Sequence, residues 1–195
     1  MSSHHVVREN QEPALVILNT NALAFEKAQE LLEWMPTVVV LASEVESVLG
    51  WGIKVDVVLS PLEDRETWVT RLADQTPIKI LTYPPADKPL LTALCYLVAI
   101  KSHAVNVLCM HPDDFGIAET FPSLDIEMFM EGRRWSWIKS GKWEKWLPAH
   151  TILYLLPEVQ WKDFPHFSSG RYVIKNDGFI ELRSTNAFWI GEDLT

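Results

Sequence analysis

The chain has 195 residues, 48% of them hydrophobic, which is enough to bury one core or two small cores that share an interface. Its formal net charge of −9 at pH 7 would repel a phosphate backbone, so we expect no nucleic-acid partner. No segment approaches the roughly 18 to 20 apolar residues of a membrane span, and the polar N-terminal segment lacks the apolar core of a signal peptide. The sequence therefore predicts a cytoplasmic protein without a membrane partner.

The first half alternates short, β-branched strands with longer helical patterns, which indicates βαβ units around a parallel sheet. The predicted strands are 14–18, 37–41, 55–59, 78–82 and 104–108, and the predicted helices are 23–35, 43–50, 63–73 and 90–101. Because Val38, Val39 and Val40 are consecutive and apolar, we expect helices on both faces of this sheet.

The amino-acid pattern changes after Leu108. Residues 109–132 contain two prolines and two glycines, which favours a loop with one short helix near 124–130. Residues 133–138 and 143–147 flank Lys139-Ser140-Gly141-Lys142 as a predicted hairpin, and further strands are expected at 151–156, 170–174, 178–183 and 186–190. The predicted fold class is α/β: a parallel, doubly wound N-terminal domain over 14–132, then a smaller β-rich, sandwich-like domain over 133–195.

The two cysteines, Cys95 and Cys109, lie in no Cys-x-x-Cys or Cys/His metal spacing. We interpret both as buried or half-buried thiols. The sequence leaves open whether they pair.

Ligands of open α/β sheets bind outside the carboxyl ends of the strands, so the candidate loops begin near residues 19, 42, 60, 83 and 109. The segment Gly52-Ile53-Lys54-Val55-Asp56 before the third strand, the βαβαβ order and the β-rich tail together resemble the thiamine pyrophosphokinase family. The resemblance implies diphosphate transfer from ATP to thiamine, with Mg²⁺ and ATP as cofactors only if the chain is active. It implies a thiamine-like or nucleotide-like small molecule as the partner.

The family's acidic turn, Gly-Asp-x-Asp-Ser, falls here on Ser60-Pro61-Leu62-Glu63-Asp64. Proline replaces the first aspartate and supplies neither a carboxylate nor an N–H group, so a metal ligand and a phosphate donor are lost together. The resemblance makes Glu63 and Asp64 the catalytic candidates, and Asp56 with Glu63 the metal candidates. Acids at a helix start also complement its dipole, which is the alternative interpretation of Glu63 and Asp64.

Three other loops depart from the family pattern as well. The family's Asp-Gly pair after strand two falls on Leu41-Ala42-Ser43-Glu44, without an acid at the matching position. The family's Lys-Asp-x-Thr-Asp falls on 85–89, and Gly-Gly-Arg-x-Asp-His on 109–114. We interpret His111, Asp113 and Asp114 as a solvated loop in preference to a metal cluster. Our hypothesis is that the fold is kept and efficient transfer lost; an active enzyme with acids drawn from Asp56, Glu63, Asp87 and Asp113 is the alternative.

Basic residues alternate with tryptophans in Arg133-Arg134-Trp135-Ser136-Trp137 and in Lys142-Trp143-Glu144-Lys145-Trp146. Such a pattern suits stacking on an aromatic ligand, but cross-strand aromatic pairs also stabilise ordinary sheets, and we favour the latter. If a ligand binds, the candidates are Trp135 and Trp137 with Thr185-Asn186, which looks like the family's Ser-Asn near the thiamine pocket. A further alternative is a homodimer that uses the tryptophan-rich hairpin as its contact patch.

Overall fold

The computed structural model describes residues 12–33, 35–75, 77–156 and 170–194. The chain divides into two compact units, Met1–Ile126 (unit 1) and Glu127–Thr195 (unit 2). The division falls inside a strand, β6 (Asp125–Met130), whereas the sequence analysis placed the domain boundary after Gly132. Within the described ranges, no helix is long and apolar enough to cross a membrane.

Unit 1 is built around five parallel strands in the order β5-β1-β2-β3-β4. Its strands are β1 (Ala14–Ile17), β2 (Val38–Leu41), β3 (Val57–Pro61), β4 (Lys79–Tyr83) and β5 (Ala104–Leu108). Its α-helices are α1 (Phe25–Leu32), α2 (Val45–Gly50), α3 (Arg65–Arg71), α4 (Pro89–Ala99) and α5 (Asp114–Glu119). Short 3-10 helices are η1 (Thr20–Ala22), η2 (Ala42–Glu44), η3 (Leu62–Asp64) and η4 (Ala73–Gln75).

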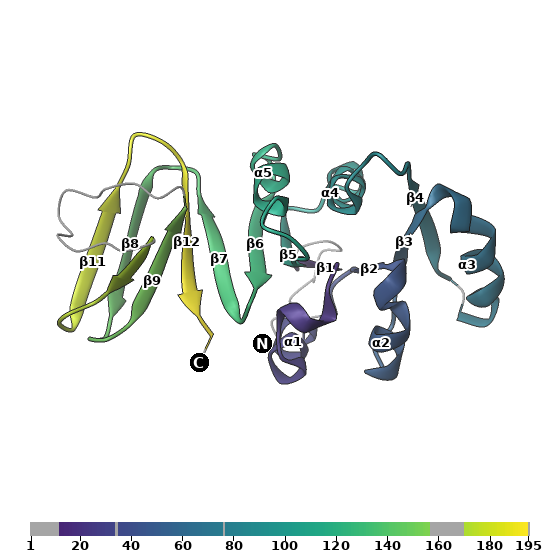
Figure 1. Cartoon of the computed structure of the whole chain (residues 1–195), viewed down its shortest axis with the longest axis horizontal. Coiled ribbons are helices and arrows are strands. Elements are labelled where there is room, and N and C mark those ends of the chain that lie inside the picture. Colours follow the sequence, from purple (N-terminus) through teal and green to yellow (C-terminus); the bar gives the residue numbers. More distant parts are fainter. Residues whose placement is uncertain (1–11, 34, 76, 157–169, 195) are drawn as a thin grey trace, which may run out of the picture. The chain divides into compact units, whose positions relative to one another are not determined.

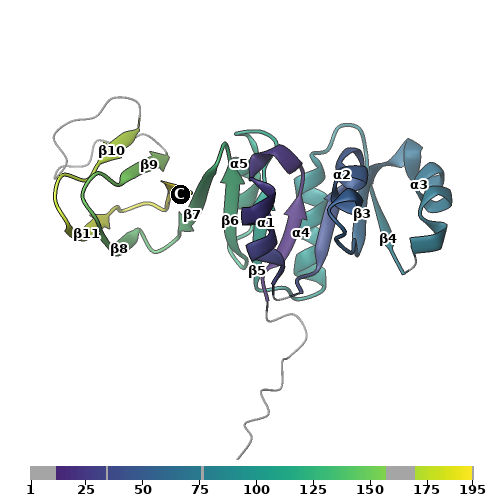
Figure 2. The same ribbon diagram turned by 90° about the horizontal axis from the view of Figure 1, so that it is seen from below.

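The central strands of unit 1 are buried on both faces, as their continuous apolar runs predict. Every residue of β1 and β2 is buried, because α1 and α2 lie on one side of the sheet and α4 on the other (Figures 1 and 2). The α4 residues Leu90, Leu94 and Leu97 are each fully buried. The predicted α/β class with a parallel, helix-covered sheet is confirmed.

The segment that follows β5 was predicted incorrectly. Residues 125–130 form strand β6 instead of a helix, because the buried Ile126 and Met128 alternate with Asp125 and Glu127 and the strand pairs with β7. The short helix of this region is α5, in residues that the sequence analysis assigned to a loop because of Gly116 and its proline neighbours.

Unit 2 contains two antiparallel sheets that pack face to face (Figure 2). One has the order β10-β9-β12-β7-β6 and the other pairs β11 with β8. The strands are β7 (Arg133–Ile138), β8 (Lys142–Leu147), β9 (Ile152–Leu156), β10 (Arg171–Val173), β11 (Gly178–Arg183) and β12 (Phe188–Asp193). Buried side chains from both sheets, including Leu153, Leu182 and Phe188, form the core between them.

The predicted hairpin of residues 133–147 is wrong. Strands β7 and β8 do not pair; residues 139–141 carry the chain from one sheet to the other, so β7 pairs with β12 and β8 with β11. The two cysteines form no disulfide with each other: Cys109 is buried, as expected, but Cys95 is exposed on α4, so the expectation of a covered thiol fails there.

Candidate functional site

The order of the strands in unit 1 locates its candidate binding edge. The chain steps from β1 to β4 in one direction and then returns to place β5 on the other side of β1. The switch of direction therefore lies between β1 and β5, and open α/β sheets bind ligands outside the carboxyl ends of the strands at such a point. The loops after β1 and β5, with those after β2, β3 and β4, form the carboxyl edge.

The loops after β1 and β2 are joined by one carboxylate. A single oxygen of Glu44 accepts hydrogen bonds from the Thr20 N–H (2.9 Å) and the Thr20 hydroxyl (2.7 Å). Its other oxygen accepts one from the Ser43 hydroxyl at 3.3 Å. Glu44 is a carboxyl-edge acid that the sequence analysis did not include among the site residues. The sequence places Thr20 after the first strand and Glu44 after the second, but only the strand order makes these two loops adjacent.

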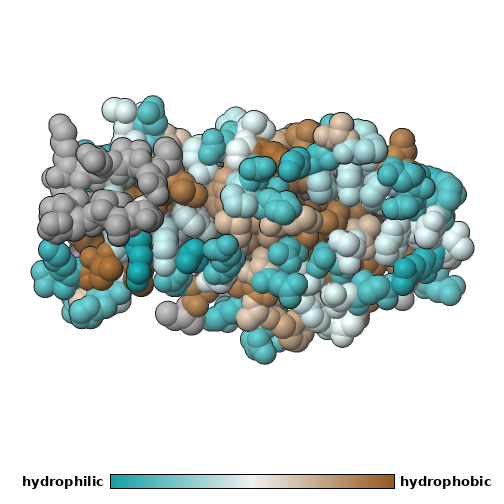
Figure 3. Space-filling model, viewed as in Figure 1, coloured by the Kyte–Doolittle hydropathy of each residue, from teal (hydrophilic) through white to brown (hydrophobic). Residues whose placement is uncertain are grey.

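At the end of β3, Glu63 and Asp64 lie exposed on η3, and Asp64 occupies the N-cap of α3 without a side-chain capping bond. The surface over α3 is mainly hydrophilic (Figure 3). Tyr83 ends the neighbouring strand opposite Pro61. Burial raises the pKa of Tyr83 above its ordinary value, and the charges of Glu63 and Asp64 raise it further. The two catalytic candidates therefore create a local negative potential at this corner.

The loop after β5 is held by Asp114, whose side chain is buried. One Asp114 oxygen accepts hydrogen bonds from the backbone N–H groups of Met110 (3.2 Å) and His111 (3.0 Å). The neighbouring Asp113 instead forms an exposed ion pair with Lys88 at 3.8 Å. Asp114 therefore orders its own loop, which is a structural role; the prediction of a solvated loop fails at Asp114, which is buried and begins α5.

Asp56 lies at the opposite edge of the sheet from Glu63. Its two carboxylate oxygens accept from the Val38 N–H (3.0 Å) and pair with the Lys54 ammonium (3.0 Å). Asp56 precedes β3 and Glu63 follows it, so at about 3.3 Å per residue they are roughly 20 Å apart. One metal ion cannot bind both, and the predicted metal pair of Asp56 and Glu63 is wrong because the intervening strand separates them.

The two tryptophans of β7 share one face of their strand, as expected, and both contact other rings. Trp135 packs against Tyr154 with ring centroids 6.1 Å apart, and Trp137 packs against Trp189 at 5.0 Å. Gly191 pairs with Trp135 in the sheet, and a Cβ there would lie 2.8 Å from the indole ring. The Trp135 side chain is therefore used in sheet packing, while Trp137 is half-buried.

Thr185 and Asn186 lie exposed in the loop between β11 and β12. This loop is fastened to the β7–β8 loop by a hydrogen bond from the Ser184 N–H to the Gly141 carbonyl, at 2.7 Å. Ile138, which follows Trp137, pairs with Phe188 directly beyond it. Of the predicted ligand-binding residues, Trp137 is thus closer along the sheet to Thr185 and Asn186 than Trp135 is.

The acids of the carboxyl edge have different local roles. Among the residues that the structure describes, no three histidine, cysteine, aspartate or glutamate side chains gather to hold a metal ion. Glu44 and Asp114 are engaged in holding loops, and Glu63 and Asp64 lie exposed on η3.

No protein-family model matches the sequence, and no curated protein matches it either. Solved structures do match over nearly the whole chain. Thiamine pyrophosphokinase from Bacillus subtilis is 10% identical, with a TM-score of 0.64 over 93% of this chain and 98% of that one. The enzyme from Candida albicans is 10% identical, with a TM-score of 0.66 over 94% and 90%. Yeast thiamin pyrophosphokinase is 8% identical, with a TM-score of 0.66 over 95% and 87%. The chain therefore has the fold of the thiamine pyrophosphokinases, from the parallel α/β unit through the β-rich unit.

Proposed function

We propose that the chain binds a thiamine-like or nucleotide-like small molecule and does not transfer diphosphate efficiently. The observation that carries this proposal is the end of β3, where Pro61 closes the strand and Glu63 and Asp64 lie exposed on η3. Catalysis of phosphoryl transfer depends almost wholly on positioned charge, and two exposed acids beside a proline supply little of it. Both units of the fold are nevertheless retained over most of the length of the enzymes it resembles.

The alternative of an active enzyme with relocated acids gains no support from the geometry. Asp56 lies at the amino edge of the sheet, and Asp113 is paired with Lys88. Of the four candidate acids, only Glu63 and Asp87 lie at the carboxyl edge without an ion pair described above.

Binding is tested by isothermal titration with thiamine, thiamine diphosphate and a non-hydrolysable ATP analogue, with and without Mg²⁺. We expect saturable heat for at least one of them. Heat that stays at the dilution background for all three at millimolar concentration refutes the proposal.

The ligand-binding candidates are tested by Trp137→Ala and Asn186→Ala, which we expect to weaken that binding. The matched control is Trp146→Ala, which removes a half-exposed tryptophan from β8 in the same unit. An equal loss from the control and the two test variants removes Trp137 and Asn186 from the proposed site.

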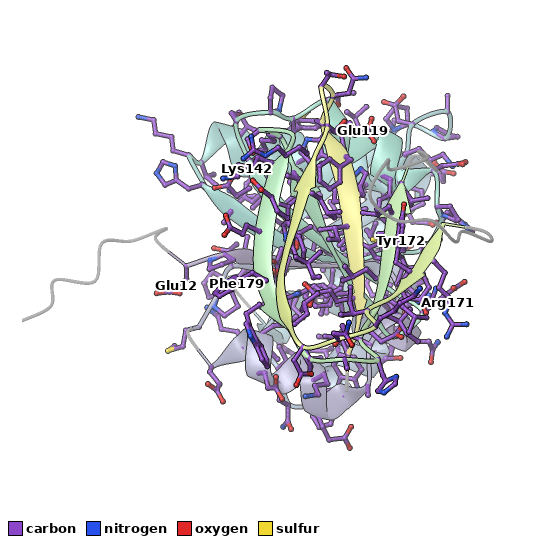
Figure 4. All side chains as sticks on the ribbon, turned by 90° about the vertical axis from the view of Figure 1, so that its left-hand side faces the viewer. Glu12, Glu119, Lys142, Arg171, Tyr172 and Phe179 are labelled. Atoms are coloured by element: carbon purple, nitrogen blue, oxygen red, sulfur yellow. The ribbon has the colours of Figure 1, made fainter. Side chains whose placement is uncertain are left out.

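A second candidate function is self-association, and one observation favours it. Trp146 and Phe179 face each other across β8 and β11 and are 52% and 73% exposed. Figure 4 looks onto this side of unit 2 and labels Phe179. Trp143, which belongs to the predicted contact patch, instead packs against the core between the sheets. We propose that any homodimer uses Trp146 and Phe179, because exposed aromatic pairs are common in interfaces.

Light scattering across a concentration series tests the dimer. We expect wild type to shift to twice the monomer mass and Trp146→Ser with Phe179→Ser to remain monomeric. The control is Leu62→Ser, which removes a comparably exposed apolar side chain from unit 1. A wild-type protein that stays monomeric, or a control that dissociates equally, contradicts this function.

A further inference from the structure

Unit 1 contains a cavity at the edge of the sheet opposite the carboxyl edge. Its volume is about 710 Å³, within the range of small-molecule sites. The lining comes from three connections: the end of α1 with the segment leading into β2, the segment between α2 and β3, and the last turn of α4. None of the predicted catalytic or ligand-binding residues lines it, although Asp56 of the rejected metal pair does.

The walls of this amino-edge cavity carry polar and apolar surface in nearly equal shares. Leu32, Pro36, Ile53 and Ile100 line it, and the Tyr96 side chain lines it as well. Such a surface favours a ligand with a flat or branched hydrocarbon body, because apolar contact supplies most of the affinity of small-molecule sites.

The polar groups of the cavity have hydrogen-bond donors to spare. Asp56 is satisfied, since its two oxygens already meet Lys54 and the Val38 N–H. The Lys54 ammonium has three N–H donors, and one of them pairs with Asp56. Lys79 lies 4.8 Å from the centre of the Tyr96 ring, and its ammonium is 3.4 Å from the Tyr96 hydroxyl. Lys79 contacts Tyr96 from outside the cavity lining; the two charged residues that line the cavity, Lys54 and Asp56, sum to zero, in a chain that is strongly negative overall.

Helix C-termini gather at this edge and favour cations, which opposes an anionic ligand. Their last carbonyls are already occupied, however: Leu32 accepts from the Met35 N–H and Tyr96 from the Ile100 N–H, both at 3.0 Å. The N–H donors of Lys54 that do not bind Asp56 therefore favour a ligand with a negative charge, because they are the charged donors that a ligand can reach.

Met35 supplies a second, independent feature of the cavity. It lines the cavity while its side chain is 90% exposed, and its φ of 54° lies in the left-handed region that non-glycine residues rarely adopt. This left-handed conformation ends α1, where the Met35 N–H donates to the Leu32 carbonyl, and the unbranched methionine side chain adapts to many shapes. Met35 is thus placed to close over the apolar body of a bound molecule.

We propose that the amino-edge cavity binds an amphipathic organic monoanion, an aromatic carboxylate or sulfonate whose ring lies against Tyr96 and Ile53 and whose charge meets Lys54. This site is separate from the carboxyl edge, so it stands or falls independently of the function proposed above.

The test uses two fluorescent probes of nearly the same shape on the full chain: anilinonaphthalene sulfonate, which is anionic, and N-phenylnaphthylamine, which is neutral. We expect the anionic probe to bind more tightly and to shift the backbone amide resonances of Gly52, Ile53, Lys54 and Ile100. Lys54→Met should weaken the anionic probe about three- to fivefold, the worth of one exposed ion pair, and leave the neutral probe unchanged.

The matched control is Lys175→Met, which removes an exposed lysine from unit 2 and should change neither probe. Three results would overturn the proposal: equal binding of the two probes, an unchanged affinity of Lys54→Met for the anionic probe, or shifts that gather at Trp146 and Phe179 instead of at the cavity. The last result identifies the probe as a ligand of the exposed aromatic pair.

Discussion

Replacing Gly141 with alanine should destabilise unit 2 far more than the same change at Gly132. Both glycines have left-handed backbones, with φ of +68° and +72°. A Cβ at Gly132 meets nothing within 4 Å, but a Cβ at Gly141 collides with the carbonyl oxygen of Ser184. The two variants therefore share the cost of the backbone conformation and differ in the collision.

The magnitude follows from these two contributions. The left-handed conformation costs an alanine about 1 to 2 kcal/mol, which is the whole expected effect of Gly132→Ala. At Gly141 the Ser184 backbone must also move, which weakens the 2.7 Å hydrogen bond from the Ser184 N–H to the Gly141 carbonyl and adds roughly 1 to 2 kcal/mol. We expect a total of about 2 to 4 kcal/mol for Gly141→Ala.

Urea unfolding followed by the near-ultraviolet circular dichroism of the tryptophans measures both variants. Because Gly141 fastens the loop that holds Thr185 and Asn186, Gly141→Ala should also alter any binding that depends on those residues. Equal destabilisation by the two substitutions would refute the collision with Ser184 and the close packing of the β7–β8 loop on the β11–β12 loop.

Three other predictions concern unit 1. Absorbance titration should show Tyr83 deprotonating above the ordinary tyrosine range, and Glu63→Gln with Asp64→Asn should lower that pKa; a pKa unmoved by the double variant contradicts the assigned charges. Because the folded-state pKa of Tyr83 is raised and the unfolded chain releases its proton first, stability should fall as pH rises above about 10; a flat profile in wild type and Tyr83→Phe alike counts against it. Asp114→Ala should cost about 1 to 3 kcal/mol in urea unfolding, because two partly buried N–H groups lose their acceptor, whereas the exposed neighbour Asp113→Ala should cost under about 1 kcal/mol.

The parallel half of the fold could be predicted from the sequence because the strand patterns and the helix patterns indicate the same architecture. Runs such as Val38–Leu41 have no polar face, so they require cover on both sides, and the helical periodicity between them supplies it. Each of the five predicted strands of this half overlaps an observed strand.

The failures arose where partners distant in the sequence decide the structure. Residues 125–130 are equally suited to a short helix, and pairing with β7 makes them a strand. Residues 139–141 have a turn composition, but β8 finds its partner in β11, more than thirty residues later. Local signals do not encode which strand completes a sheet.

Only part of the candidate site could be located from the sequence. The strand end places Glu63 and Asp64 directly after β3, where their catalytic role stays a prediction, but Asp56 was grouped with Glu63 from a motif resemblance that ignored the strand between them. The bond from Thr20 to Glu44 depends on the adjacency of β1 and β2, and the donors of Lys54 depend on how Asp56 is already satisfied. Both are properties of three-dimensional contacts, which residue types alone do not reveal.

The central claim, that the carboxyl edge does not support efficient diphosphate transfer, is tested most directly by Mg²⁺-dependent release of AMP from ATP and thiamine. The enzyme from Bacillus subtilis serves as the positive control, and Glu66→Ala as the control for Glu63→Ala on the same surface. We predict a rate at least about a thousandfold below that of the control enzyme, unchanged by Glu63→Ala, because a metal ligand and a phosphate donor are lost at Pro61. A rate within about tenfold of the control enzyme that Glu63→Ala abolishes and Glu66→Ala preserves would contradict the account.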